Sequence, residues 1–145
     1  MAEVLDDPVL GRLAWDDEFH WWTAEVELRP GQEVEVIICY DHEFNIGIDA
    51  RQARLIQARD WVLRIRKREP AYRTWSAQQL VDRRWNKDEP MTAQDIGQLL
   101  RLLSIECDSD GSARLNWDDE DVLFCGHGIY TQLAPSGECV AVRMQ

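Results

Sequence analysis

The 145-residue chain has no apolar stretch that approaches the roughly 20 residues needed for a membrane-spanning helix. Its first residues, MAEVLDDPVLGR, lack the basic segment and following apolar run of a secretory signal peptide. The four cysteines are widely spaced and form no C-x-x-C pair, so we expect them to be reduced and mostly buried. These absences favour a cytoplasmic protein with no membrane partner.

The sequence also lacks the short motifs that identify common reactions. It contains no G-x-S-x-G nucleophile motif, and its glycine-containing segments near the C-terminus resemble no phosphate-binding loop. Paired carboxylates occur throughout so acidic a chain and therefore identify no catalytic pair. The sequence favours a protein without enzymatic activity and predicts no cofactor.

Positive charge is scarce in this chain. The sequence contains 16 basic and 27 acidic residues, which gives a net charge of −11. This negative charge argues against nucleic acid or an anionic membrane as the partner. The imbalance is uneven: residues 1–48 contain 12 acids and 2 bases, whereas residues 49–101 contain 7 acids and 12 bases. The middle of the chain is therefore a different kind of segment from the acidic parts that flank it.

Alternating apolar and polar residues in segments 19–28 and 33–40 predict two strands joined by a turn. Trp22 belongs to the apolar face of the first strand. Keeping both apolar faces on the same side predicts a three-residue loop, Pro30–Gln32, and a register that places Glu27 opposite Glu35.

The middle of the chain has the apolar spacing of helices. A first helix is predicted from Asp49 to about Arg68, ended by Pro70, and a second over residues 71–85. A third begins at Thr92, with a capping box to the acid three residues later, and extends to about residue 103.

Strand patterns return after residue 104 and alternate with turns rich in Asp, Gly and Pro. Trp117 lies on the apolar face of one of these strands. The predicted fold is a single α+β domain over residues 1–145, with strands at about 9–40, helices at about 49–103 and strands at about 104–143. We expect an antiparallel sheet built from the N- and C-terminal strands, with the helical middle packed on one face.

Cys125 and His127 lie two residues apart, shortly after four consecutive acids, Asp118–Asp121. Calcium-loop spacing fails, because with Asp108, Asp110 and Gly111 as loop positions three, five and six Trp117 stands at position twelve, where a bidentate glutamate is needed. No second pair of residues has zinc-ligand spacing. Apolar residues share the face of His127, which favours a buried structural histidine, and Gly126 suggests a bulge or a close backbone approach. We predict no bound metal. The alternative is a small metal-dependent or hydrolytic enzyme around Cys125, His127 and the acidic turn.

The acids form the candidate binding surface. Like charges directly opposite each other destabilise a sheet, so the facing glutamates predicted in the first hairpin reduce stability. Such a surface suits a basic protein partner, whereas the alternative is an ordinary solvated face. The predicted partner-binding residues are Glu25, Glu27, Glu33, Glu35, Asp118, Asp119, Glu120 and Asp121. A structural role is predicted for His127, Gly126, Trp22 and Trp117.

Two segments, LGRLAWDDEFHWW and LNWDDEDVLFCGHGIYTQLAPSGE, resemble a small bacterial domain family of unknown function. Its members open with a leucine-glycine strand, here Leu10-Gly11, and close with an acidic turn, a Phe-x-Gly-His strand and a glycine turn. These features match Asp118-Asp119, Phe124–His127 and Gly137. Related domains occur among immunity proteins that neutralise polymorphic toxins, which are often basic nucleases. The resemblance implies an intracellular binding protein with no chemistry of its own, and it carries over no catalytic residue.

Overall fold

The computed structural model of the chain describes residues 4–39, 48–83, 90–119 and 128–144. In these residues eight strands form one sheet in the order β1 to β8, and two helices lie between β4 and β5 in the chain. The elements are β1 (Val4–Asp7), β2 (Gly11–Asp16), β3 (Trp21–Arg29), β4 (Gln32–Cys39), α1 (Ile48–Leu80), α2 (Ala93–Leu99), β5 (Arg101–Cys107), β6 (Ala113–Asp118), β7 (Ile129–Leu133) and β8 (Cys139–Met144).

The sheet consists of two antiparallel four-stranded groups joined by one parallel pair of strands. β4 and β5 run parallel, whereas every other pair of neighbouring strands is antiparallel. Parallel neighbours require a long crossover, which the helical middle of the chain supplies. This arrangement confirms the predicted α+β fold, with strands from both flanks in one sheet.

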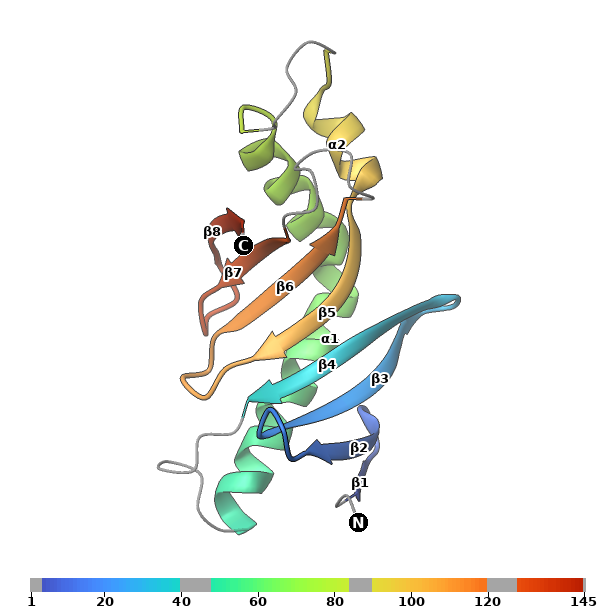
Figure 1. Cartoon of the computed structure of the whole chain (residues 1–145), viewed down its shortest axis with the longest axis vertical. Helices are drawn as coiled ribbons and strands as arrows, with labels where there is room; N and C mark the ends of the chain where they lie inside the picture. The colour runs from blue at the N-terminus through green and yellow to red at the C-terminus, as the bar shows by residue number, and fades with distance from the viewer. Residues whose placement is uncertain (1–3, 40–47, 84–89, 120–127, 145) are drawn as a thin grey trace.

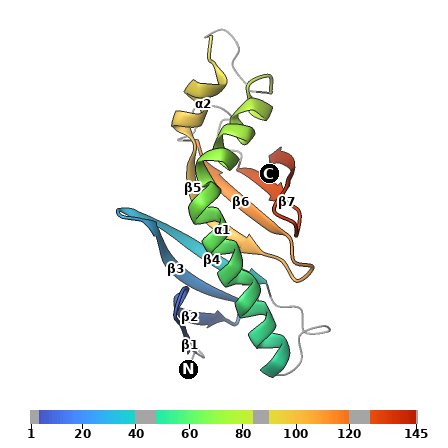
Figure 2. The ribbon, with the colours of Figure 1, turned by 180° about the vertical axis from the view of Figure 1, so that it is seen from behind.

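One face of the sheet is covered and the other is not. The long helix α1 crosses behind the sheet in Figure 1 and in front of it in Figure 2, and it spans both groups of strands. No helix in the described part of the chain lies on the opposite face, which we call the uncovered face. The core therefore forms between α1 and the alternate strand residues that point toward it. Its largest fully buried side chains are Leu10, Leu13, Leu28, Ile38, Ile65, Leu80, Ile96, Leu100, Leu102, Ile105 and Leu115.

The first hairpin has a register different from the predicted one. Glu25 pairs with Glu35 and Glu27 with Glu33, so the expected pairing of Glu27 with Glu35 is wrong. The turn contains two residues, Pro30–Gly31, and a β-bulge precedes it. A two-residue turn alone would place the apolar residues of β3 and β4 on opposite faces, and the extra residue in the bulge realigns them. All four glutamates still lie on the uncovered face.

Proline does not end the first helix. α1 is continuous over 33 residues with Pro70 inside it, so the two predicted helices are one. Proline has no N–H for the carbonyl four residues earlier, here that of Arg66. The side chain of Arg29 replaces the missing donor, because its Nη2 donates to the Arg66 carbonyl oxygen at 3.0 Å. A side chain from β3 thus satisfies the backbone group that the proline leaves without a partner.

The short helix α2 begins as predicted and ends earlier. The Thr92 hydroxyl accepts from the Asp95 N–H at 3.1 Å, and the Asp95 carboxylate accepts from the Thr92 N–H at 2.9 Å. This pair is the predicted capping box. The expected continuation to residue 103 is wrong, because Leu100 is extended and β5 starts at the next residue.

Candidate functional site

Four glutamates stand in two facing pairs on the uncovered face of the first hairpin. Glu25 lies directly opposite Glu35, and Glu27 directly opposite Glu33. Glu35 is only partly exposed, while the other three are exposed. The neighbouring strand β5 adds Glu106, which pairs with Ile37, two positions after Glu35 on β4. The structure therefore brings together the four acids predicted from the hairpin and a fifth that the sequence analysis did not include.

The acids affect one another's ionisation. Partial burial, with the negative charges of Glu25 and Glu106 nearby, raises the pKa of Glu35 above its ordinary value. Glu106 has a polar contact that holds it on this face, because the Asn116 side-chain amide donates to its carboxylate at 3.3 Å and to the Ser104 hydroxyl at 2.8 Å. The stripe of negative charge therefore extends from β3 across β4 to β5.

The far side of the uncovered face has the opposite charge. Arg114 of β6 faces Glu106 in register, and its guanidinium lies 4.8 Å from the ring centroid of Tyr130. Arg143 of β8 lies in register with Tyr130. Apart from the ion pair between Arg101 of β5 and Asp118 of β6, the face is thus acidic over β3–β5 and basic with an aromatic ring over β6–β8.

An aromatic pair stands beside the acids at the turn between β2 and β3. The Phe19 ring stacks on the Trp21 ring with centroids 4.8 Å apart and planes 19° from parallel. Phe19 is 56% exposed, although phenylalanine is usually buried. Strand alternation places Trp21 on the face opposite the buried Trp22, beside Cys39 in register. Neither ring was predicted from the sequence to be a site residue, although the spacing of Phe19 and Trp21 places both opposite the apolar face of the strand.

The C-terminal acids do not form one exposed group in the described residues. Asp118 pairs with Arg101 at 3.0 Å, and Asp119 is only 4% exposed. Glu120 and Asp121 lie outside the described residues, as do Gly126, His127 and Cys125, on which the alternative enzyme depends. That alternative, and the structural role of His127, therefore stay predictions from the sequence.

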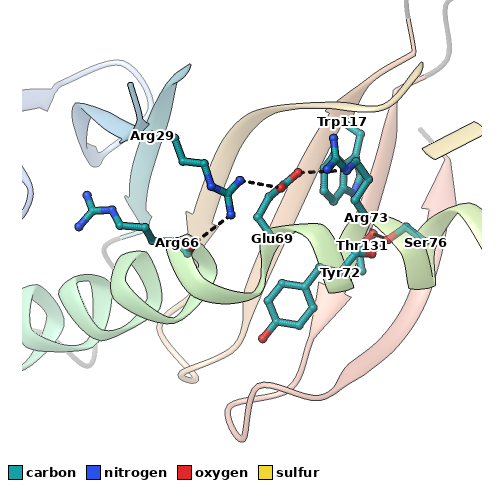
Figure 3. Close-up of polar contacts among 8 residues, drawn as sticks. All are labelled: Arg29, Arg66, Glu69, Tyr72, Arg73, Ser76, Trp117 and Thr131. Atoms are coloured by element: carbon teal, nitrogen blue, oxygen red, sulfur yellow. Dashed lines mark hydrogen bonds and ion pairs between the residues drawn. The ribbon is translucent and has the colours of Figure 1, made fainter. Parts of the chain in front are cut away.

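Behind the uncovered face, a buried carboxylate connects the first hairpin to α1. Glu69 is 1% exposed and lies beside Pro70 on the helix. Arg29 donates to one of its oxygens at 3.0 Å, and Arg73 lies 3.5 Å from the other (Figure 3). Arg66 reaches back from α1 and donates to backbone carbonyls of β3. These contacts hold the acidic hairpin in a fixed position against the helix.

A second buried polar group connects α1 to the other half of the sheet. The Trp117 indole N–H donates to the Thr131 hydroxyl at 2.9 Å, and the Ser76 hydroxyl donates to the Tyr72 carbonyl at 2.8 Å. The two hydroxyls are 2.5 Å apart, so Thr131 donates to Ser76 (Figure 3). The indole N–H of Trp117 and the hydroxyls of Thr131 and Ser76 therefore all have hydrogen-bond partners. Trp22 and Trp117, predicted to be structural, are each 3% exposed.

The cysteines in the described residues are unsuited to nucleophilic catalysis. Cys39, Cys107 and Cys139 are free thiols. Burial raises the pKa of Cys39 and of Cys107 to about 12, so both are uncharged at neutral pH. Arg54 lies beside them and donates to the carbonyls of Cys39 at 2.7 Å and Cys107 at 2.8 Å, at the ends of β4 and β5. Its guanidinium therefore supplies hydrogen-bond donors to the carbonyl groups at the ends of these two strands.

The described ranges, 4–39, 48–83, 90–119 and 128–144, contain no group of three or more His, Cys, Asp or Glu side chains that could hold a metal ion. Neither of the two helices described combines the length and apolar composition that crossing a membrane requires.

The fold and the site define an α+β protein with a helix on one face of an eight-stranded sheet and an uncovered, charged face on the other. A family model described as an uncharacterized protein conserved in bacteria (DUF2262) matches residues 7–144. The chain therefore belongs to this bacterial family, which agrees with the resemblance to a small bacterial domain of unknown function. No curated protein and no solved structure matches it.

Proposed function

We propose that this protein binds a basic protein partner through the uncovered face of its sheet, as an immunity-like protein that neutralises a basic toxin. The observation that carries the proposal is the pairing of Glu25 with Glu35 and of Glu27 with Glu33 on an uncovered face. Like charges directly opposite each other are destabilising, so this arrangement lowers the stability of the fold. A partner that brings positive charge to the face removes that repulsion on binding.

The positions of the acids suit rapid and specific association. Their field extends over β3, β4 and β5, where it attracts a basic protein before contact and increases the association rate. The Arg29 and Glu69 contacts hold the hairpin against α1, so little ordering is needed on binding. Tight, rapid capture is what neutralising a toxin requires, and the reaction needs no catalytic group.

The test begins with capture of the partner from cells of the host bacterium on the immobilised wild-type chain. Association is then measured by surface plasmon resonance for the double variant Glu25→Lys, Glu35→Lys at several salt concentrations. A matched control, Asp82→Lys with Glu138→Lys, makes the same change in net charge at exposed acids that lie outside the acidic strands β3–β5.

We expect the captured protein to be basic and the wild-type association rate to fall as salt rises. The face variant should associate at least about tenfold more slowly than wild type, and the control should stay within about threefold. Equal losses for the two variants would mean that only net charge matters, and the proposed face would be wrong. Coexpression tests the toxin: a captured partner that halts growth alone, but not together with this chain, supports the immunity-like role.

A further inference from the structure

The exposed ring of Phe19 has a fixed position. The Asp16 carboxylate accepts from the backbone N–H groups of Glu18 at 2.9 Å and Phe19 at 3.1 Å. The His20 N–H donates to the Asp16 carbonyl at 2.9 Å, and His20 has a φ of 57°, in the left-handed region. The turn is therefore closed by three hydrogen bonds, and a side chain that contacts its rings meets a surface that needs no ordering.

The surroundings of the rings are acidic and partly apolar. Asp17 and Glu18 are exposed in the same turn. Along β3 the uncovered face continues from Trp21 to Glu25. Ile37 of β4 pairs with Thr23, which lies midway between these two residues. Ile37 is 5% exposed, so its side chain is covered by its neighbours, and the accessible apolar surface here comes mainly from the Phe19 ring, which is 56% exposed. Aromatic residues with a charged border are the usual composition of an interface site that contributes much of the binding energy.

We propose that the Phe19–Trp21 pair is the anchor at which an arginine side chain of the protein partner stacks. This inference rests on the proposed function and names the group that the partner brings. A guanidinium is planar and weakly hydrated, so it packs flat on an aromatic ring while its N–H groups reach neighbouring carboxylates. Phe19 offers an open ring face for such stacking, and the acids of the turn supply the hydrogen-bond acceptors.

The probe is a short peptide of alternating glycine and arginine, blocked at both ends. Matched peptides carry lysine or citrulline in place of arginine, and citrulline keeps the shape of arginine without its charge. Binding is followed through the indole N–H resonance of Trp21 in ¹⁵N-labelled protein, which is assigned from its loss in Trp21→Phe. The arginine peptide should shift this resonance saturably, the lysine peptide should bind more weakly, and the citrulline peptide should not bind.

Phe19→Ala should weaken binding of the arginine peptide about two- to fivefold, the range expected for an exposed cation–π contact. Phe19→Tyr keeps the ring and should bind like wild type. Both variants should melt at the wild-type temperature, because the Phe19 side chain is largely exposed and adds little to stability. Equal affinity of Phe19→Ala and wild type, or equal binding of the lysine and arginine peptides, would overturn the proposal.

The result separates this inference from the proposed function. If Phe19→Ala leaves the arginine peptide unaffected while Glu25→Lys with Glu35→Lys slows association with the captured partner, the anchor is wrong and the binding face stands. If the peptide requires Phe19 but the glutamate variant associates with the partner like wild type, the anchor stands and the proposed face fails.

Discussion

Replacing Arg29 by methionine tests the connection between the first hairpin and α1. Methionine keeps much of the apolar stem but removes two hydrogen bonds, one to the buried Glu69 carboxylate and one to the Arg66 carbonyl. A bond to a charged group contributes about 1.5–3 kcal/mol and a bond to a carbonyl about 0.5–1.5 kcal/mol. In the variant the Glu69 carboxylate still has its ion pair with Arg73 at 3.5 Å. The loss of stability is therefore smaller than for a buried charge with no partner. We expect Arg29→Met to lower the free energy of unfolding by about 2–4 kcal/mol.

A double-mutant cycle with Pro70→Ala separates the two bonds. Alanine restores the N–H that the Arg66 carbonyl lacks, so in that background the carbonyl keeps a donor when Arg29 is removed. Arg29→Met should therefore lower stability by about 1 kcal/mol less in the Pro70→Ala protein than in wild type. Urea denaturation followed by circular dichroism and tryptophan fluorescence measures all four proteins.

The control for this cycle is Arg12→Met, which removes an exposed arginine of β2 and should change stability by no more than about 0.5 kcal/mol. An effect of Arg29→Met no larger than that of the control would refute a role for Arg29 in stability. Equal effects of Arg29→Met in the two backgrounds would refute the explanation given for the proline within the helix.

Three further predictions concern the uncovered face and the buried polar contacts, each measured by urea denaturation. Glu35→Gln should raise the free energy of unfolding by about 0.2–1 kcal/mol at pH 7, because the raised pKa of Glu35 means that folding disfavours its charged form. The gain should disappear as the pH falls below 4.5, the ordinary pKa of this carboxyl, and a gain that persists at pH 3 would contradict the electrostatic cause. Thr131→Val should lower stability by about 1–3 kcal/mol because the Trp117 indole N–H loses its acceptor. Thr131→Ser keeps the hydroxyl and should be affected less, so an equal loss in both would rule out the hydrogen bond as the reason. Arg54→Met should lower stability by at least about 2 kcal/mol, since carbonyls at the ends of two strands lose their donor, and a smaller loss would mean that water replaces the guanidinium.

The alternating segments of this sequence predict the sheet well because burial on one face imposes a period of two on each strand. Trp22 and Trp117 follow this rule, and both are buried on the predicted side. The register of the first hairpin could not be derived in the same way, because registers that differ by two residues keep the same faces. The β-bulge that distinguishes them has no signal in the residue pattern.

The continuous helix also had no local signal. Pro70 is tolerated because Arg29 lies 37 positions from the carbonyl that the proline leaves without a donor, and this proximity exists only in the folded protein. The acids of the candidate face were found because charge is visible in the sequence. Phe19 was missed because an apolar residue is expected to be buried, although its spacing from Trp21 places it opposite the apolar face of the strand.

The parallel pairing of β4 with β5 has a consequence for how the chain folds. It joins Glu35–Ile38 to Ser104–Cys107, segments that are far apart in the sequence, whereas the other pairings in the described sheet join strands that follow one another directly. Loop-closure entropy delays contacts between distant segments, so folding slows as their share grows. We expect each four-stranded group to form first, and the two groups to join late, when α1 has already shortened the distance between them.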